Sequence, residues 1–168
     1  SISVYIYSHS RKSWGSGVLV KNKDTSYTVL TAAHVISNEE NQEDIIIKTQ
    51  IDKVVHVAQK NTINLFGSLD LATLDFQSEK SYSTAFVDSS YNLKPGDDIW
   101  ISGYSDILNT IHLLYPGKLM GINNKANNGL ELFYNNPTRP GSSGSPILNP
   151  DGSLIGIHVG HYTEPLED

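Results

Sequence analysis

The residues with the clearest capacity for chemistry lie in a short segment rich in glycine and serine, residues 141–146 (GSSGSP). Attack on a peptide carbonyl requires an exposed hydroxyl and backbone N–H groups aimed at the oxyanion that develops. Glycine permits backbone angles that turn N–H groups inward. The segment could therefore present the Ser143 hydroxyl beside an oxyanion hole formed by the N–H groups of Gly141 and Ser143. Taken by itself, an ordinary turn between two strands is the simpler interpretation.

A serine hydroxyl is a weak nucleophile, and the sequence offers a base and an acid that could activate it. His34 follows the apolar run 27–30, where its ring could project into a cleft. Asp70 ends a polar loop and begins an apolar run, where its carboxylate could orient the second imidazole nitrogen. Taken alone, His34 could be an ordinary surface histidine, and Asp70 could be an aspartate that caps a strand. The order His34, Asp70, Ser143, with no helix predicted between them, favours a catalytic triad.

The elements that must position these residues are short strands. Runs rich in β-branched and aromatic residues alternate with Gly, Pro, Asn, Asp and Ser, which is typical of an all-β sandwich or barrel. A helical turn is expected at residues 32–37, and a turn-rich break at 89–97 could join two barrels. The predicted strands cover residues 3–7, 17–21, 27–30, 45–50, 54–58, 69–75, 84–87, 99–103, 111–121, 130–134, 146–149 and 154–159.

Three motifs in this order, TAAH (31–34), DLA (70–72) and GSSGSP (141–146), resemble those of the chymotrypsin-like, or trypsin-fold, serine peptidases. The resemblance extends over nearly the whole chain. The segments WGSGVL (14–19) and GDDIWISGY (96–104) look like strands of the family's first and second barrels.

This resemblance implies two six-stranded antiparallel β-barrels with the active site in the cleft between them. An N-terminal barrel at residues 1–88 would carry His34 and Asp70, and a C-terminal barrel at 89–168 would carry Ser143, together forming one peptidase domain. Ser142 stands where zymogen-activated animal members have an aspartate that pairs with a new amino terminus, so activation by that ion pair is not expected.

Two further residues bear on specificity, because Thr138 and His158 resemble the pocket residues of bacterial glutamyl endopeptidases of the staphylococcal V8 type. A threonine hydroxyl and an imidazole N–H can both donate to a carboxylate, so cleavage after Glu is expected. Viral 3C-like proteases use a similar pair to bind glutamine, and packing of His158 on the barrel wall is a third interpretation. Val159 and Gly160 would form the strand edge that pairs with the substrate backbone.

Composition limits the other classes of function. The net charge is −6 and no basic stripe is present, which argues against nucleic-acid binding. No apolar run approaches the roughly 20 residues of a membrane helix. The chain has no cysteine, and the pair His158 and His161 would face opposite sides of a strand, so no metal site is predicted.

No cofactor is expected, and the partners expected are a peptide or protein substrate and other domains of a longer parent chain. The sequence begins without the basic and apolar regions of a signal peptide. It is compatible with a secreted bacterial enzyme and with a domain of a larger intracellular protein. HtrA-type bacterial peptidases share the motifs, although their PDZ domains are absent from this sequence.

Two rival functions belong to other classes. A protease-fold binding module that no longer cuts would usually lack a member of the triad, and none is missing here. An esterase on another scaffold is disfavoured, because α/β-hydrolases place the serine before the acid and the histidine.

Overall fold

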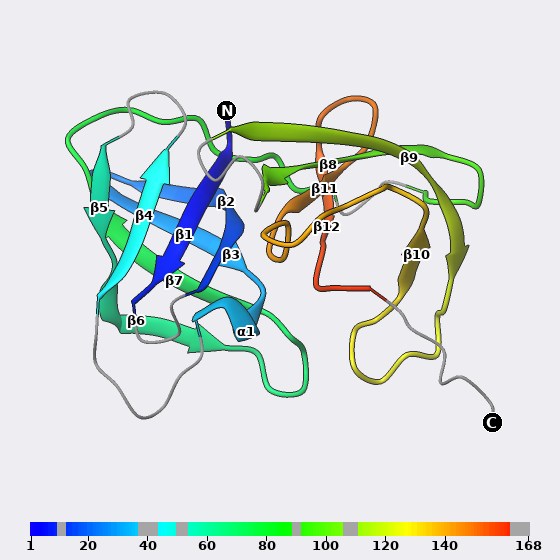
Figure 1. Ribbon diagram of the computed structural model, residues 1–168, viewed down its shortest axis with the longest axis horizontal. Helices are drawn as coiled ribbons and strands as arrows, with labels where there is room; N and C mark the ends of the chain where they lie inside the picture. The colour runs from blue at the N-terminus through cyan, green and yellow to red at the C-terminus, as the bar shows by residue number, and fades with distance from the viewer. Residues whose placement is uncertain (10–12, 37–43, 50–53, 89–91, 106–110, 162–168) are drawn as a thin grey trace.

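Strands dominate the computed structural model, which describes residues 1–9, 13–36, 44–49, 54–88, 92–105 and 111–161 (Figure 1). Three parts of the predicted elements lie outside the described residues: position 37 of the helical turn, position 50 of a strand, and positions 89–91 of the break between barrels.

The first sheet is antiparallel and contains seven strands in the order β5-β4-β1-β2-β3-β7-β6. Buried positions alternate along β1, β3, β4 and β7, because successive side chains of a strand point to opposite faces. Their buried faces meet in a core in which the rings of Tyr27 and Phe76 stack at 5.5 Å. The strands are β1 (Ser3–Ser8), β2 (Ser13–Lys23), β3 (Ser26–Thr31), β4 (Ile45–Thr49), β5 (Val55–Val57), β6 (Gln59–Leu65) and β7 (Ala72–Gln77).

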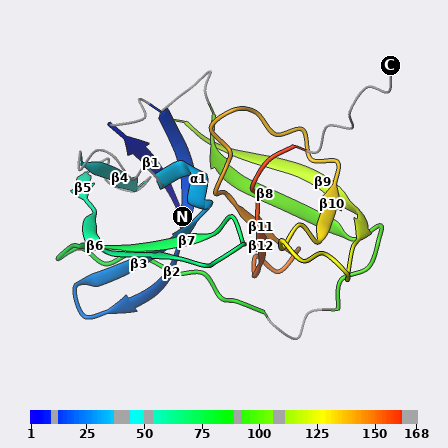
Figure 2. The ribbon, with the colours of Figure 1, turned by 90° about the horizontal axis from the view of Figure 1, so that it is seen from below.

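The second sheet is also antiparallel and contains five strands in the order β10-β9-β8-β11-β12. Its smaller core includes Ile99, Ile101, Tyr115 and Ile147. Figure 2 shows the two curled sheets side by side, each formed by its own half of the chain. The strands are β8 (Asp98–Tyr104), β9 (His112–Ile122), β10 (Leu132–Tyr134), β11 (Pro146–Leu148) and β12 (Leu154–Ile157).

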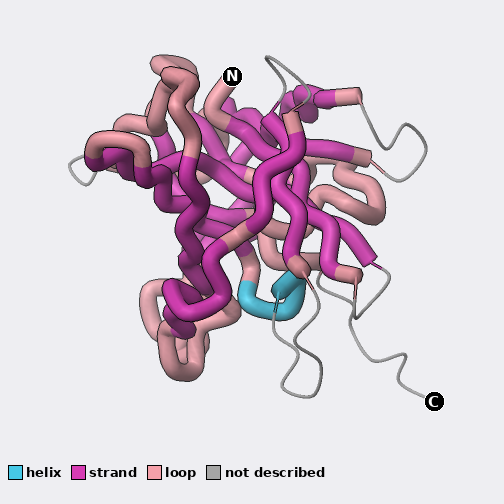
Figure 3. The backbone as a smooth tube through the Cα atoms, turned by 90° about the vertical axis from the view of Figure 1, so that its left-hand side faces the viewer, coloured by secondary structure: helices cyan, strands magenta, loops and turns pink. Residues whose placement is uncertain are grey.

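One helical turn, α1 (Ala33–Ile36), follows β3 and is the only helix in the part of the chain that the structure describes (Figure 3). Val35 and Ile36 are buried and anchor the turn on the core of the first sheet. His34, between Ala33 and Val35, remains exposed. The short helix therefore presents the imidazole at the surface while its neighbours hold it in place.

The prediction of an all-β chain with two antiparallel sheets is confirmed, with the described strands divided seven and five rather than six and six. Strand β6 was not predicted because its sequence, QKNTINL, is polar and mostly exposed. The predicted strand at 84–87 makes an isolated bridge between Val87 and Leu154 instead of joining a sheet. The domain boundary at residue 88 stays a prediction.

The two sheets approach each other closely where β2 faces β8. A Cβ atom added at Gly103 of β8 would lie 1.8 Å from Ser145 Oγ and 2.9 Å from both Ser145 Cβ and Ser16 Oγ. Only a residue without a side chain allows this approach. The glycine at this position is therefore a requirement of packing, against Ser145 within the second half of the chain and against Ser16 of the first half.

We expect the substitution Gly103→Ala to lower the free energy of unfolding by about 1–3 kcal/mol, since the new methyl group overpacks this contact. A new Ser145 rotamer could move Oγ but not Cβ. Urea denaturation measures the change. Gly121→Ala on β9 is the matched control, because an added Cβ there meets nothing within 4 Å. Equal stabilities of the two variants would contradict the packing argument.

Candidate active site

His34 and Asp70 lie together, as the sequence predicts, and two hydrogen bonds join them. Asp70 Oδ2 is 2.6 Å from His34 Nδ1, and Asp70 Oδ1 accepts a hydrogen bond of 2.9 Å from the His34 backbone N–H. The Ala33 N–H also donates to the Asp70 carbonyl, at 3.2 Å. Because an ionised carboxylate only accepts, the proton of a neutral ring resides on Nδ1, which leaves the lone pair on Nε2.

The segment around Ser143 forms a tight turn. The Ser142 N–H donates to the Arg139 carbonyl at 3.1 Å, and Gly141 has φ 95°, in the region that favours glycine. Gly144 has φ 87°. Neither the Gly141 N–H nor the Ser143 N–H donates a hydrogen bond to any residue that the structure describes. The turn therefore carries two backbone N–H groups that have no hydrogen-bond acceptor among the described residues.

The backbone of Ser143 lies beside the helix that carries His34. The Ser16 N–H of β2 donates to the Ser143 carbonyl at 2.8 Å. A Cβ atom added at Gly15 would be 2.7 Å from the Val35 side chain and 2.9 Å from the Ser143 carbonyl oxygen, so both flank the same glycine. Among the described contacts, no hydrogen bond joins Ser143 Oγ to the His34 ring.

His158 is buried, with 2% of its surface exposed, and its ring contacts two hydroxyl groups. Its Nδ1 is 2.6 Å from Tyr134 Oη and its Nε2 is 3.3 Å from Thr138 Oγ1. Burial lowers the pKa of His158 to about 4, with smaller contributions from the nearby charges of His161 and His34. His158 is therefore neutral near pH 7.

Tyr134 was missed at the sequence level, although the strand that contains it was predicted. Its hydroxyl lies 24 positions away from His158 along the chain, and no spacing pattern connects the two residues. Burial raises the pKa of Tyr134, so its phenol stays protonated and neutral.

Strand β12 ends at Ile157, so Val159 and Gly160 lie beyond it, after His158, and the observed strand is shorter than the predicted one at 154–159. The side chain of Val159 packs against the core of the first sheet. Neither residue makes a backbone hydrogen bond to another described residue. Unpaired backbone groups next to a strand could accept a further strand.

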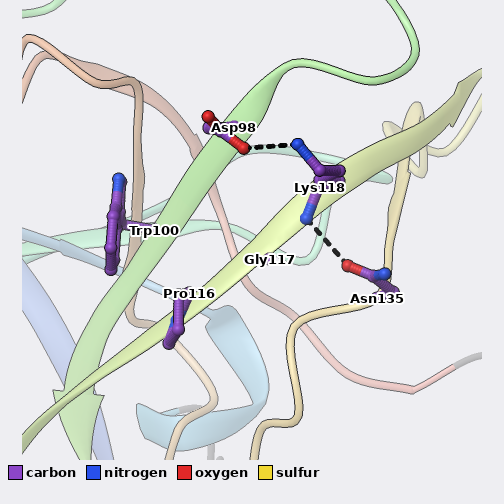
Figure 4. A pocket seen from close by; sticks show the side chains of 6 residues that line it. All are labelled: Asp98, Trp100, Pro116, Gly117, Lys118 and Asn135. Atoms are coloured by element: carbon purple, nitrogen blue, oxygen red, sulfur yellow. Dashed lines mark hydrogen bonds and ion pairs between the residues drawn. The ribbon is translucent and has the colours of Figure 1, made fainter.

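A hollow of about 460 Å³ lies elsewhere, on the outer side of β8 and β9 (Figure 4). Lys118 donates to Asp98 at 2.7 Å across it, and the Lys118 N–H donates to Asn135 Oδ1 at 2.7 Å. None of the predicted site residues lines it. The residues that line it are Asp98, Trp100, Pro116, Gly117, Lys118 and Asn135.

The described ranges contain no group of three or more His, Asp or Glu residues arranged to hold a metal ion. The same ranges contain no helix with the length and apolar character needed to cross a membrane.

Known proteins are similar to this chain in sequence. Among curated proteins, the chain is 27% identical over 158 residues to a putative protease Do-like 14 from Arabidopsis thaliana, covering 88% of this chain and 35% of that protein. It is 26% identical over 163 residues to a serine protease HtrA-like from Staphylococcus aureus, covering 90% of this chain and 20% of that protein. The chain thus spans about a third of the length of the first relative and a fifth of the length of the second.

Solved structures share the fold. A crystal structure of Deg5 superposes with a TM-score of 0.79 at 20% identity, over 95% of this chain and 79% of that one. A serine endoprotease from Yersinia pestis superposes with a TM-score of 0.73 at 21% identity, over 96% of this chain and 54% of that one. Residues 15–157 match the family described as trypsin-like peptidase domain. The chain therefore belongs to the trypsin-like peptidase domain family.

Proposed function

We propose that this domain is a serine endopeptidase in which Ser143 is the nucleophile, His34 the general base and Asp70 the residue that orients it. The observation that carries the proposal is the hydrogen bond of 2.6 Å between Asp70 Oδ2 and His34 Nδ1. It fixes the tautomer whose Nε2 lone pair can take the proton of a serine hydroxyl.

In the proposed reaction, Ser143 Oγ attacks the carbonyl carbon of the scissile bond while His34 Nε2 takes the hydroxyl proton. The N–H groups of Gly141 and Ser143 donate to the oxyanion, and His34 then protonates the leaving amine. Water hydrolyses the resulting acyl-enzyme. The absence of a hydrogen bond between Ser143 and His34 is compatible with this reaction, because such contacts often tighten only when substrate binds.

We propose glutamate as the residue before the cut, bound by Thr138 and His158. Thr138 Oγ1 lies between two imidazoles, 3.3 Å from His158 Nε2 and 3.4 Å from His161 Nε2, so several donors converge where a carboxylate could bind. Both histidines and Thr138 can donate a hydrogen bond to an anionic oxygen.

Glutamine is a second candidate, and the neutrality of His158 favours it. A buried carboxylate requires a compensating positive charge, whereas a neutral amide requires only hydrogen-bond partners. An imidazole with a pKa of about 4 supplies a donor without a charge at pH 7.

The substrate backbone would pair with Val159 and Gly160. Their unbonded backbone groups could add the substrate as an extended strand, a contact that does not depend on substrate sequence. Other domains of a longer parent chain remain part of the proposal, because the curated relatives are several times longer than this chain.

We expect Ser143→Ala to reduce peptidase activity by a factor on the order of 10⁶ without changing the melting temperature, because it removes the attacking oxygen. A fluorophosphonate probe should label the wild type at Ser143 only.

Asp70→Asn should lower kcat by about 10⁴-fold, because the imidazole loses its oriented tautomer. Asp151→Asn, in an exposed turn, is the control with wild-type activity. A folded wild type that neither cleaves nor reacts with the probe would support a binding module instead.

Peptides that differ only in the residue before the cut separate the specificity candidates. We expect the highest kcat/KM for Glu, and a reduction of at least tenfold for that peptide in Thr138→Val, because one donor to the carboxylate is lost. A preference for Gln would select the second candidate. Cleavage after Arg or Leu would refute a pocket formed by Thr138 and His158.

The pKa of His158 predicts a dependence of stability on pH. The unfolded chain takes up a proton at this residue near pH 6.5, whereas the folded protein resists protonation down to about pH 4. The free energy of unfolding should therefore fall as the pH is lowered from about 6.5 towards 4. His158→Gln should flatten this slope. An NMR titration midpoint near 6.5 for the His158 ring would contradict the prediction.

A further inference from the structure

Ser16 on β2 is fully buried, yet every polar contact of its hydroxyl is directed at the second half of the chain. The Tyr104 N–H of β8 donates to Ser16 Oγ at 2.9 Å. Ser16 Oγ in turn is 2.9 Å from the Gly141 carbonyl oxygen. A buried hydroxyl is stable only when it is hydrogen bonded, and this one is satisfied on both sides.

The direction of both hydrogen bonds follows from the chemistry of the partners. A backbone N–H can only donate and a carbonyl oxygen can only accept. The single proton of the Ser16 hydroxyl must therefore point to Gly141. Together with the Ser16 N–H, which donates to the Ser143 carbonyl at 2.8 Å, Ser16 binds two carbonyl groups of one turn.

These two carbonyls belong to the residues whose N–H groups would form the oxyanion hole. At Gly141 and at Ser143 the carbonyl is held by Ser16, while the N–H donates to no described residue. Glycine is the residue with the most backbone freedom, so Gly141 needs an external anchor to remain in one conformation. Because a carbonyl shares its peptide plane with the N–H of the next residue, Ser16 fixes the planes 141–142 and 143–144, which directly follow the Gly141 and Ser143 N–H groups along the chain.

We propose that Ser16 is a positioning residue for the oxyanion hole: by binding the Gly141 and Ser143 carbonyls, it keeps the N–H groups of both residues turned to the substrate. This inference rests on the proposed peptidase function. Ser16 belongs to the first sheet and would act through the turn at residues 141–144, without contacting the substrate itself.

A purely structural role is the alternative, and Ser3 on β1 provides the comparison. Ser3 is also buried, and it also connects the sheets, with Oγ 2.9 Å from the Ser102 carbonyl oxygen and 2.8 Å from Ser102 Oγ. It has no hydrogen bond to residues 141–144. Ser3→Ala and Ser16→Ala therefore each remove a buried hydroxyl that connects the two sheets, but only Ser16→Ala removes a hydrogen bond to the turn at residues 141–144.

The experiment measures kcat, KM and melting temperature for both variants with one peptide substrate. We expect Ser16→Ala to lower kcat about ten- to a hundredfold with little change in KM, because the hole is assembled in only part of the population. A peptide boronate inhibitor should bind more weakly by a similar factor. Ser3→Ala should keep the wild-type kcat even if its melting temperature falls. Ser16→Cys, which preserves volume and a weak donor, should have an intermediate kcat.

A wild-type kcat in folded Ser16→Ala, or an equal loss of kcat in Ser3→Ala, would overturn the proposal. If Ser16→Ala does not fold, Ser16→Cys is measured in its place, and a wild-type kcat in that variant would also overturn the proposal. A wild type that neither cleaves peptides nor reacts with fluorophosphonate would overturn the proposed function itself, which distinguishes the two failures.

Discussion

The direct contact between the backbone of β2 and the turn at residues 141–144 is the constraint on which the site depends. A Cβ atom added at Gly144 would lie 2.0 Å from the Ser16 carbonyl oxygen and 2.3 Å from Thr31 Oγ1. No side chain fits there, so at Gly144 the main chain of the turn lies directly against the Ser16 carbonyl and the Thr31 side chain. A contact this close leaves little room for adjustment, because any shift between the two halves would move the turn relative to β2.

The two halves contribute unequally to the site. His34 and Asp70 are joined within the first half, where backbone and side-chain hydrogen bonds hold α1 against Asp70, two residues before β7. Ser143 belongs to the second half, and its described bond to the first half is the one between its carbonyl and the Ser16 N–H. In the proposed mechanism, alignment of the hydroxyl with the imidazole is therefore a property of the docked halves and not of either one alone.

Sequence patterns predicted the elements that bury one face, because alternation of apolar residues is visible locally. They failed for β6, whose polar residues pair at the edge of the sheet, and for residues 84–87, where Phe86 and Val87 are 71% and 57% exposed. His34 and Asp70 were predicted to lie together because a family motif marks them. Ser16 and Tyr134 were not, because their partners are 125 and 24 positions away and backbone carbonyls have no sequence signature.

His34 and His158 lie in environments that suit the different tasks proposed for them. The side chain of His34 is 45% exposed and is hydrogen bonded to the carboxylate of Asp70. His158 is 2% exposed and contacts only neutral hydroxyls through its ring nitrogens, so a charge there is not compensated. The first environment suits a group that must accept and return a proton. The second suits a fixed donor that recognises a substrate oxygen without changing its own protonation. Because substrate would also displace water from the His34–Asp70 pair, binding would strengthen their attraction at the moment when the proton moves.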